Sequence, residues 1–448
     1  MGTIANVDAN RYNTGMSLPY FTKKFPGIGG VIKQRVEDFF VQEIPLYEPS
    51  GKGEHVYCEI QKTGLTTFEA INRIGRELNV STRDIGYAGL KDARAISRQI
   101  LSIWGTTEEA VMGLKIPGVT IQWAIRHVNK MRLGHLAGNR FAVKIRNVNA
   151  TDVVKVRPML AEIERRGMPN FFGEQRFGHR GNNDLLGAAV VRGDAKMLLG
   201  LLLGNPVPEV DDRKTSHARQ AFDKGDLEQA MRLFPRSHGM ERRILARLIK
   251  TGKAGAAARA VDDKLRRLWV SALQSRAFNE VVEKRIDSLD KLMTGDLAWK
   301  HDSGAVFLVE DAVVEQPRCD AFEISPSGPL IGYRMTLPQG EPLAIEQAVF
   351  TASGFTPADF RRAGDLKVSG ARRPLRVQPK DVQLEGGVDE HGPHVTIAFT
   401  LPPGSFATVL VREITKSDDS EAQDLDSDED EQNTSDQEPT EAGNQSAV

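Results

Sequence analysis

The sequence predicts a mixed α+β protein in which two strand-rich regions enclose a largely helical middle. Residues 31–148 contain short alternating segments separated by turn residues, residues 152–285 change to a helical spacing of apolar residues, and strands return after residue 294. The chain of 448 residues is 40% hydrophobic and 27% charged, which is typical of globular proteins of two or three domains.

The first region contains several short strands and a single helix. Apolar and polar residues alternate in 39–41, 55–60 and 141–145, whereas 67–78 has helical spacing. Proline, serine and glycine residues mark turns between the strands.

The middle region is helical and ends where alternation returns. Residues 265–282 have the best helical spacing and follow two aspartates, which are a helix start signal. Residues 185–203 are the most apolar window, but three charged residues interrupt it, so we expect two buried helices and no membrane span. Residues 394–401 alternate as a strand.

Composition favours a cytoplasmic protein. The N-terminus lacks the pattern of a secretory signal, and two distant cysteines, Cys58 and Cys319, fit a reducing compartment as packed thiols. Residues 417–448 hold twelve acidic and no basic residues, so the body of the chain has a basic excess that suits a polyanionic partner. This acidic segment has too few apolar residues to fold and is predicted to be disordered.

The stretch Gly86 to Gln99 places a carboxylate, Asp92, next to Lys91 in a glycine-containing turn. Residues 85–88 and 99–104 have strand character, so Asp92 is predicted to lie on a loop with a strand on either side. Gly89 is expected to adopt a backbone conformation closed to other residues. A lone lysine–aspartate pair is usually a solvated surface pair, so spacing alone does not establish a site.

The wider pattern resembles a known family. The stretch matches Gly-x-Lys-Asp-x-x-Ala-x-(Ser/Thr)-x-Gln, and with five further blocks in the same order it is similar to the TruD family of tRNA pseudouridine synthases. The further blocks are 33–43, 132–141, 169–178, 327–330 and 401–413.

The resemblance implies a split domain. A pseudouridine synthase catalytic domain with a mixed sheet would comprise residues 1–166 and 378–415, and an inserted, largely helical TRUD domain would comprise 167–377. The strand at 394–401 and a helix at 406–413 would return to the first domain and complete its sheet. Residues 416–448 would form the disordered acidic tail.

The resemblance also implies a reaction, the isomerisation of uridine to pseudouridine in tRNA, with uridine 13 as the expected position. No redox or phosphoryl step occurs, so no cofactor and no metal are expected. The chemistry needs an ionised carboxylate that attacks covalently or removes a ribose proton, and Asp92 matches the family's catalytic aspartate. A nearby cation must offset its desolvation, for which Lys33 is a better candidate than the adjacent Lys91. Both lysines and Arg132 are expected among the substrate-binding residues.

The same motif matches imply a pocket for the uracil base, formed by Phe39, Asn139, Phe141 and Phe406. Phe141 would stack on the base and Asn139 would hydrogen-bond to it. From the residues alone, both Phe39 and Phe141 could instead belong to the core, and Asn139 could cap a turn.

Two further segments have open interpretations. Basic residues across two predicted strands either contact phosphates or form a solvated strand face; they are Arg126, Lys130, Arg132, Arg140, Lys144 and Arg146. Residues 170–178, rich in aromatics and glycines with one arginine, form either a structured loop near RNA or a buried hinge. Phe172 in this segment stands where tyrosine is frequent in the family.

The expected partner is tRNA, with no membrane and no small-molecule cofactor, and the sequence does not address the oligomeric state. An alternative is a catalytically silent protein that binds or folds tRNA and keeps the pocket. The presence of both Lys91 and Asp92 favours the enzyme, because a silent relative could lose either residue.

Overall fold

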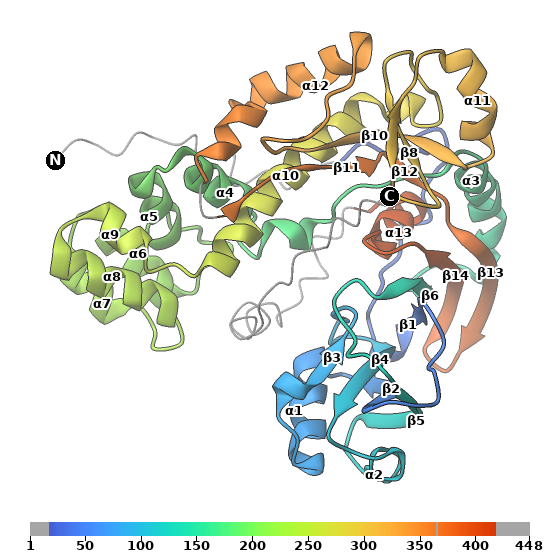
Figure 1. Cartoon of the computed structure of the whole chain (residues 1–448), viewed down its shortest axis with the longest axis horizontal. Helices are drawn as coiled ribbons and strands as arrows, with labels where there is room; N and C mark the ends of the chain where they lie inside the picture. Colours follow the sequence, from blue (N-terminus) through green and yellow to red (C-terminus); the bar gives the residue numbers. More distant parts are fainter. Residues whose placement is uncertain (1–17, 364–365, 418–448) are drawn as a thin grey trace. The chain divides into compact units, whose positions relative to one another are not determined.

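The computed structural model describes residues 18–363 and 366–417. Contacts divide these residues into two compact units. The small unit is Ile32–Lys144, and the large unit comprises the described residues up to Val31 and from Ile145 onward. Each unit mixes strands and helices, which confirms the predicted fold class (Figure 1). The predicted disordered tail lies outside the described residues, apart from its first two residues.

The small unit is built on a twisted mixed sheet with the strand order β6-β1-β4-β2-β5. The strands are β1 (Phe39–Pro45), β2 (His55–Thr63), β3 (Ile85–Tyr87), β4 (Ile96–Trp104), β5 (Val119–His127) and β6 (Leu136–Arg146). Strands β1 and β4 are parallel, and the other neighbours in this part of the sheet are antiparallel. Since β2 occupies one edge of β4, β1 and β3 pair with successive parts of the other edge.

One helix, α1 (Thr67–Leu78), covers one face of this sheet. Thr66 and Glu69 form a capping box at its N-terminus, and its apolar side buries Ile71 and Ile74 against strand residues that include Cys58. A second, short helix, α2 (Glu108–Met112), was not predicted. Five residues are too few to show helical periodicity, which explains the difference.

Most of the helices belong to the large unit. They are α3 (Val153–Arg166), α4 (Asn183–Arg192), α5 (Ala195–Leu203), α6 (Arg213–Asp223), α7 (Leu227–Leu233), α8 (Gly239–Thr251), α9 (Ala254–Ala258), α10 (Asp263–Lys284), α11 (Ala312–Asp320), α12 (Gly340–Ser353) and α13 (Ala407–Thr415). Helix α10 packs along α4, and α5 to α9 gather into a separate cluster (Figure 1). The two buried helices predicted in 185–203 are α4 and α5, and the helix predicted in 265–282 is α10.

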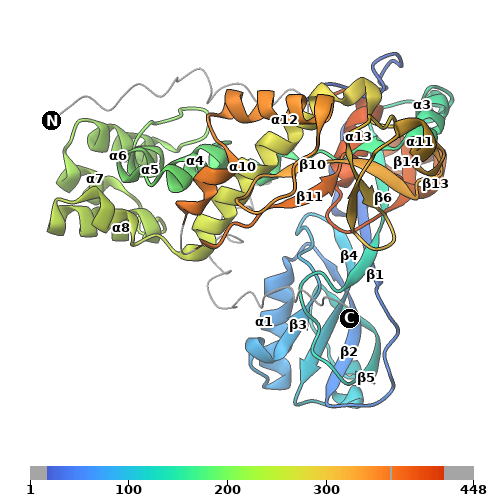
Figure 2. The ribbon, with the colours of Figure 1, turned by 45° about the horizontal axis from the view of Figure 1, so that its top comes forward.

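Short strands complete the large unit. They are β7 (Met168–Pro169), β8 (Leu297–Lys300), β9 (Val306–Leu308), β10 (Ile324–Leu330), β11 (Ala371–Pro374), β12 (Arg376–Val377), β13 (Lys380–Asp389) and β14 (Gly392–Leu401). Strands β11-β10-β8-β9 form one sheet, beside which α10 and α12 run (Figure 2). Strand β7 pairs with β12, so the two ends of the predicted insertion lie next to each other.

Both cysteines are buried and free, as predicted. Burial raises the pKa of Cys58 to about 12 and that of Cys319 to about 11. Within 18–363 and 366–417, no helix is long and apolar enough to cross a membrane.

Candidate active site

The loop that carries Asp92 connects β3 to β4, as the sequence predicted. Gly86, in β3, is required there because a Cβ atom would overlap the carbonyl oxygen of Met131 and the hydroxyl of Ser102. The expectation for Gly89 was wrong: its φ is not positive, and a Cβ there would meet Lys91 Nζ at an ordinary contact distance of 3.6 Å. Glycine is therefore needed at Gly86, where β3 meets the segment of Met131, and not at Gly89 in the turn itself.

Asp92 forms an ion pair with Lys33, the partner that the sequence favoured. Lys33 Nζ lies 2.8 Å from Asp92 Oδ2, and the lysine side chain is 7% exposed whereas that of the aspartate is 39% exposed. The same ammonium lies 4.9 Å from the centre of the Phe39 ring. A buried cation thus holds a carboxylate that remains open to solvent on its other side.

Lys91 points away from Asp92 and pairs with Glu43. Its Nζ lies 2.8 Å from Glu43 Oε2, and both side chains are almost fully buried. Burial raises the pKa of Glu43, although the charge of Lys91 acts in the opposite direction. Glu43 Oε1 also accepts from the Ile100 N–H at 3.4 Å, close to where pairing of β4 changes from β1 to β3.

A third lysine, Lys62, holds the backbone of the loop. Its side chain is fully buried, and Nζ donates to the carbonyl oxygens of Leu65 at 2.5 Å, Asp92 at 2.8 Å and Lys91 at 3.1 Å. Because two of these carbonyls flank the side chain of Asp92, Lys62 fixes the direction in which that side chain leaves the loop.

The sheet register places the remaining polar residues on the face that carries these contacts. Asn139 on β6 lies directly opposite Glu43, and Phe141 lies opposite Val41. Ser97 on β4 lies between Val41 and Lys62 on its two neighbouring strands. Neighbouring residues in register point to the same side of a sheet, so this face combines aromatic and polar groups.

Several of these polar atoms have no hydrogen-bond partner among the described residues. They are Asn139 Oδ1, Ser97 Oγ and Gln99 Nε2, all buried. The hydroxyl of Thr67 accepts from the Lys91 N–H and donates to Gln99 Oε1, which fixes the orientation of that amide. Native proteins leave few such atoms unsatisfied, so this face offers hydrogen-bonding capacity to a ligand.

Two of the three phenylalanines of the predicted pocket, Phe39 and Phe141, meet in the small unit. The ring centroids of Phe39 and Phe141 are 6.2 Å apart with an edge-to-face arrangement, and both side chains are buried. Burial agrees with a place in the core, whereas proximity to Lys33 and Asn139 favours a place in a pocket. Asn139 lies within β6, so the alternative that it caps a turn is wrong.

The predicted basic run does not form one strip. Arg126 lies on β5 and Arg140 on β6, and three strands separate them in the sheet. Arg132 is exposed on the loop between these strands, which contacts the beginning of the Asp92 loop through a hydrogen bond from the Gly134 N–H to the carbonyl of Ala88 at 2.8 Å. Basic residues that are close in the sequence therefore lie on separate parts of the sheet.

Phe406 belongs to the large unit. It is the N-cap residue of α13, and its ring centroid lies 5.9 Å from that of Phe172. The structure therefore brings together Lys33, Phe39, Lys91, Asp92, Asn139 and Phe141 within the small unit, with Arg132 nearby, and places Phe406 in the other unit.

The sequence prediction assigned no role to Glu43, Lys62, Thr67 or Gln99. Glu43 could have been noticed, because it continues the alternation of Phe39 and Val41 and so places a carboxylate on an apolar face. Lys62 gave no comparable signal, since its acceptors are backbone carbonyls remote in sequence.

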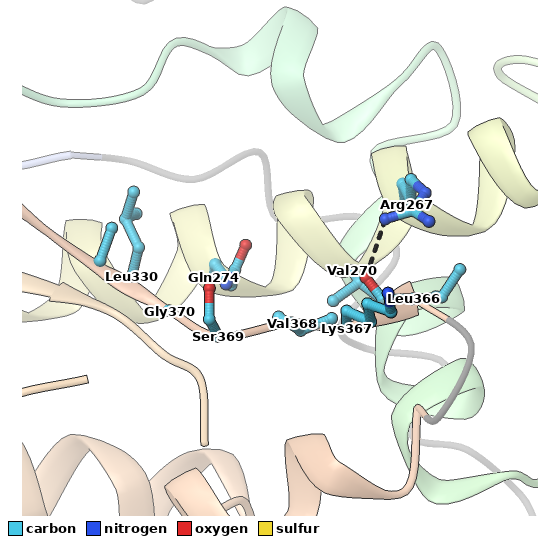
Figure 3. Close-up of a pocket in the computed structure, with 10 residues that line it drawn as sticks. Arg267, Val270, Gln274, Leu330, Leu366, Lys367, Val368, Ser369 and Gly370 are labelled. Atoms are coloured by element: carbon cyan, nitrogen blue, oxygen red, sulfur yellow. Dashed lines mark hydrogen bonds between the residues drawn. The ribbon is translucent and has the colours of Figure 1, made fainter. Parts of the chain in front are cut away.

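A cavity in the large unit contains none of the predicted site residues. It has a volume of about 280 Å³ and lies between α10 and residues 366–371. Figure 3 shows Arg267 across from this segment, where it donates to the carbonyl of Leu366 at 2.8 Å. No group of three or more metal-ligating side chains occurs in the part of the chain that the structure describes.

The small-unit site presents an ion-paired carboxylate next to two edge-to-face aromatic rings and to side-chain amides with unpaired atoms, which is the composition of a site for a planar polar ring. Comparison with known proteins agrees. The family model described as tRNA pseudouridine synthase D (TruD) matches residues 15–414. The chain therefore belongs to the TruD family of tRNA pseudouridine synthases.

Individual relatives are similar over most of their length. A tRNA pseudouridine synthase D from Geobacter metallireducens is 47% identical over 398 residues, covering 89% of this chain and 97% of the relative. One from Geotalea daltonii is 45% identical over 400 residues, covering 89% of this chain and all of the relative. A crystal structure of a putative tRNA pseudouridine synthase D from Methanosarcina mazei has a TM-score of 0.78 at 27% identity, covering 91% and 97% of the two chains.

Proposed function

We propose that this chain isomerises uridine to pseudouridine in tRNA, with uridine 13 as the expected position, Asp92 as the reacting carboxylate and no cofactor. Family membership supports the reaction class. The observation that carries the assignment of Asp92 is its ion pair with Lys33, in which the cation is buried and the carboxylate remains accessible.

The reaction breaks the bond between N1 of uracil and C1′ of ribose and forms a bond between C5 and C1′. A proton leaves C5 and N1 gains one, so no electrons or groups need to come from elsewhere. Asp92 acts either by attack on C1′ or by removal of a ribose proton. In both cases Lys33 stabilises the ionised carboxylate when the bound base excludes water.

The base is proposed to bind against Phe141, with Phe39 as a wall of the pocket. Asn139 hydrogen-bonds to the edge of the uracil, which is supported by its buried and unsatisfied Oδ1. Arg132 contacts RNA phosphate from its exposed loop. Lys91 was predicted among the substrate-binding residues, but its buried pair with Glu43 favours a role in holding the loop. With tRNA as substrate, we place the protein in the cytoplasm.

The test is to map pseudouridine in tRNA after incubation with wild type, Asp92→Asn and Asp84→Asn, the last being a control aspartate of the same unit that precedes β3. We expect product with wild type and the control, and none with Asp92→Asn. If wild type binds tRNA and modifies none, the silent RNA-binding alternative holds. Equal product from Asp92→Asn would remove Asp92 from the mechanism.

A further inference from the structure

In the large unit, two arginines contact the ring of Phe172 in the 170–178 segment. The guanidinium carbons of Arg373 and Arg176 lie 4.3 Å and 5.6 Å from the ring centroid. Phe172 is buried and is held by reciprocal hydrogen bonds between its backbone and the amide of Asn279. Both guanidinium groups thus lie near one buried ring, and Arg176 is close enough for its charge to act on Arg373.

Each arginine uses only part of its hydrogen-bonding capacity within the protein. Arg373 Nη2 donates to both oxygens of Asn170 and to the carbonyl of Gly404. Arg176 donates from Nε and Nη2 to the hydroxyls of Ser275 and Ser271. The Nη1 groups of both arginines make no hydrogen bond within the described residues, and Arg373 Nε is buried without a partner there.

Neither guanidinium has a carboxylate within ion-pair distance in the part of the chain that the structure describes. Burial and, second to it, the charge of the nearby Arg176 together lower the pKa of Arg373 to about 10; burial also lowers the pKa of Arg176. Arg276 shows the contrasting arrangement, because it lies over Phe177 at 5.2 Å and pairs with Asp184 at 3.1 Å.

A purely structural arginine looks different in this protein. Arg376 is also buried and has no carboxylate within ion-pair distance among the described residues, yet its Nε, Nη1 and Nη2 all donate to oxygens of the fold. Arg373 and Arg176 instead each leave the Nη1 group without an acceptor among the described residues. The positive charges of Arg176 and Arg373 are therefore not balanced by the ring or by the nearby hydroxyls, and this favours the binding of an anion.

We propose that Arg176 and Arg373 form a binding site for a phosphodiester group of the RNA substrate. The inference rests on the proposed function for the nature of the ligand. Phosphate oxygens would accept from the two Nη1 groups, and the planar guanidinium with its several N–H donors is suited to this contact. The site explains why 170–178 combines aromatics with an arginine, and it favours the interpretation of this segment as a structured loop near RNA.

The test is the salt dependence of tRNA binding by wild type, Arg373→Gln and Arg176→Gln. Loss of one phosphate contact should reduce the magnitude of the negative slope of log Kobs against log salt concentration by about 0.7 to 0.9. The matched control is Arg276→Gln, a stacked arginine with its own carboxylate, for which the slope should not change. Arg373→Lys should retain the wild-type slope, because the charge remains.

Weaker binding with an unchanged slope in both glutamine variants would show that the arginines only support the loop, and so would failure of both variants to fold. If only Arg373→Gln fails to fold, the salt slope measured for Arg176→Gln tests the proposal. Binding of inorganic phosphate that depends on both arginines, together with an unchanged tRNA slope, would assign the site to a free anion and overturn the proposal. Pseudouridine formation by wild type is measured separately. If wild type forms product but the glutamine variants leave the salt slope unchanged, the phosphate site is rejected and the proposed reaction stands. If the variants change the slope but wild type forms no product, the proposed reaction is rejected and the phosphate site stands.

Discussion

Lys62 Nζ donates to the carbonyl oxygen of Asp92 at 2.8 Å, although the two residues lie on different elements of the small unit. The carboxylate of the same aspartate is held by Lys33. Asp92 is therefore fixed twice, through its backbone by a fully buried lysine and through its side chain by a nearly buried one. Its position depends on contacts that the signature motif itself does not contain.

The first prediction concerns this backbone contact. Lys62→Met keeps the length of the side chain but cannot donate, so the loop should shift while the apolar packing remains. Because small displacements of a reacting group are costly, we expect the single-turnover rate of pseudouridine formation to fall on the order of 100-fold with little change in the Kd for tRNA.

The control for Lys62 is Arg219→Met in the large unit. Arg219 is also buried and donates to the carbonyls of Leu202 and Gly204. Its loss should lower the thermal midpoint without the same effect on the rate. Equal rates for wild type and Lys62→Met would contradict a positioning role.

Most helices and strands could be predicted from the strong periodicity of apolar residues. The direction in which individual side chains point could not. Helix α10 and strand β14 match the predicted segments to within two residues at each end, because many apolar positions define each period. The partner of Lys91 was harder to foresee. The two neighbouring side chains leave the loop towards different partners, so Lys91 pairs with Glu43 while Asp92 pairs with Lys33.

The sequence could not reveal contacts that depend on how distant segments meet. Lys62 approaches the Asp92 loop only because β2 and β4 pair in one register, which no local pattern encodes. The requirement for glycine at Gly86 likewise comes from the backbone of Met131. The boundaries of the inserted domain stay a prediction, which is supported by the pairing of β7 with β12.

The second prediction concerns the charge next to Asp92. Lys33→Met removes the ammonium from a buried position 2.8 Å from the carboxylate. Losing one preorganised electrostatic contact should lower the rate of product formation by roughly 100- to 1,000-fold. Lys33→Arg should recover part of this loss because it restores the charge. Equal activity of the Met and Arg variants would show that charge at this position is unimportant.

The third prediction concerns recognition of the base. Asn139→Ala removes an oxygen that has no hydrogen-bond partner among the described residues, so folding should lose little. If Asn139 bonds to the uracil edge, loss of that bond should cost about 1 to 3 kcal/mol in kcat/KM. A lower thermal midpoint with unchanged kcat/KM would instead assign Asn139 to the structure.

The fourth prediction concerns the thiols. Burial raises the pKa of both Cys58 and Cys319, so neither is a thiolate at neutral pH and neither is accessible. An aromatic disulfide reagent should label no thiol rapidly in the folded protein and two per chain after denaturation. Rapid labelling of one thiol without loss of structure would show that its part of the core opens readily.

The last prediction concerns pH and Glu43. Burial raises the pKa of this carboxyl above the ordinary value of 4.5, so between the two values the folded state binds more protons than the unfolded state. Stability contributed by this group therefore falls as the pH rises through that window. Glu43→Gln resembles the protonated form at every pH and lacks this dependence.

Wild type should accordingly lose thermal stability relative to Glu43→Gln as the pH is raised from below 4.5 towards neutrality. Each unit by which the pKa is raised corresponds to about 1.4 kcal/mol. The measurement is the difference between the thermal midpoints of the two full-length proteins at each pH. Contributions from other titrating groups are common to both proteins and cancel in this difference. If wild type instead gains relative to the variant, the attraction of Lys91 outweighs burial, and the pair stabilises the loop by its charge.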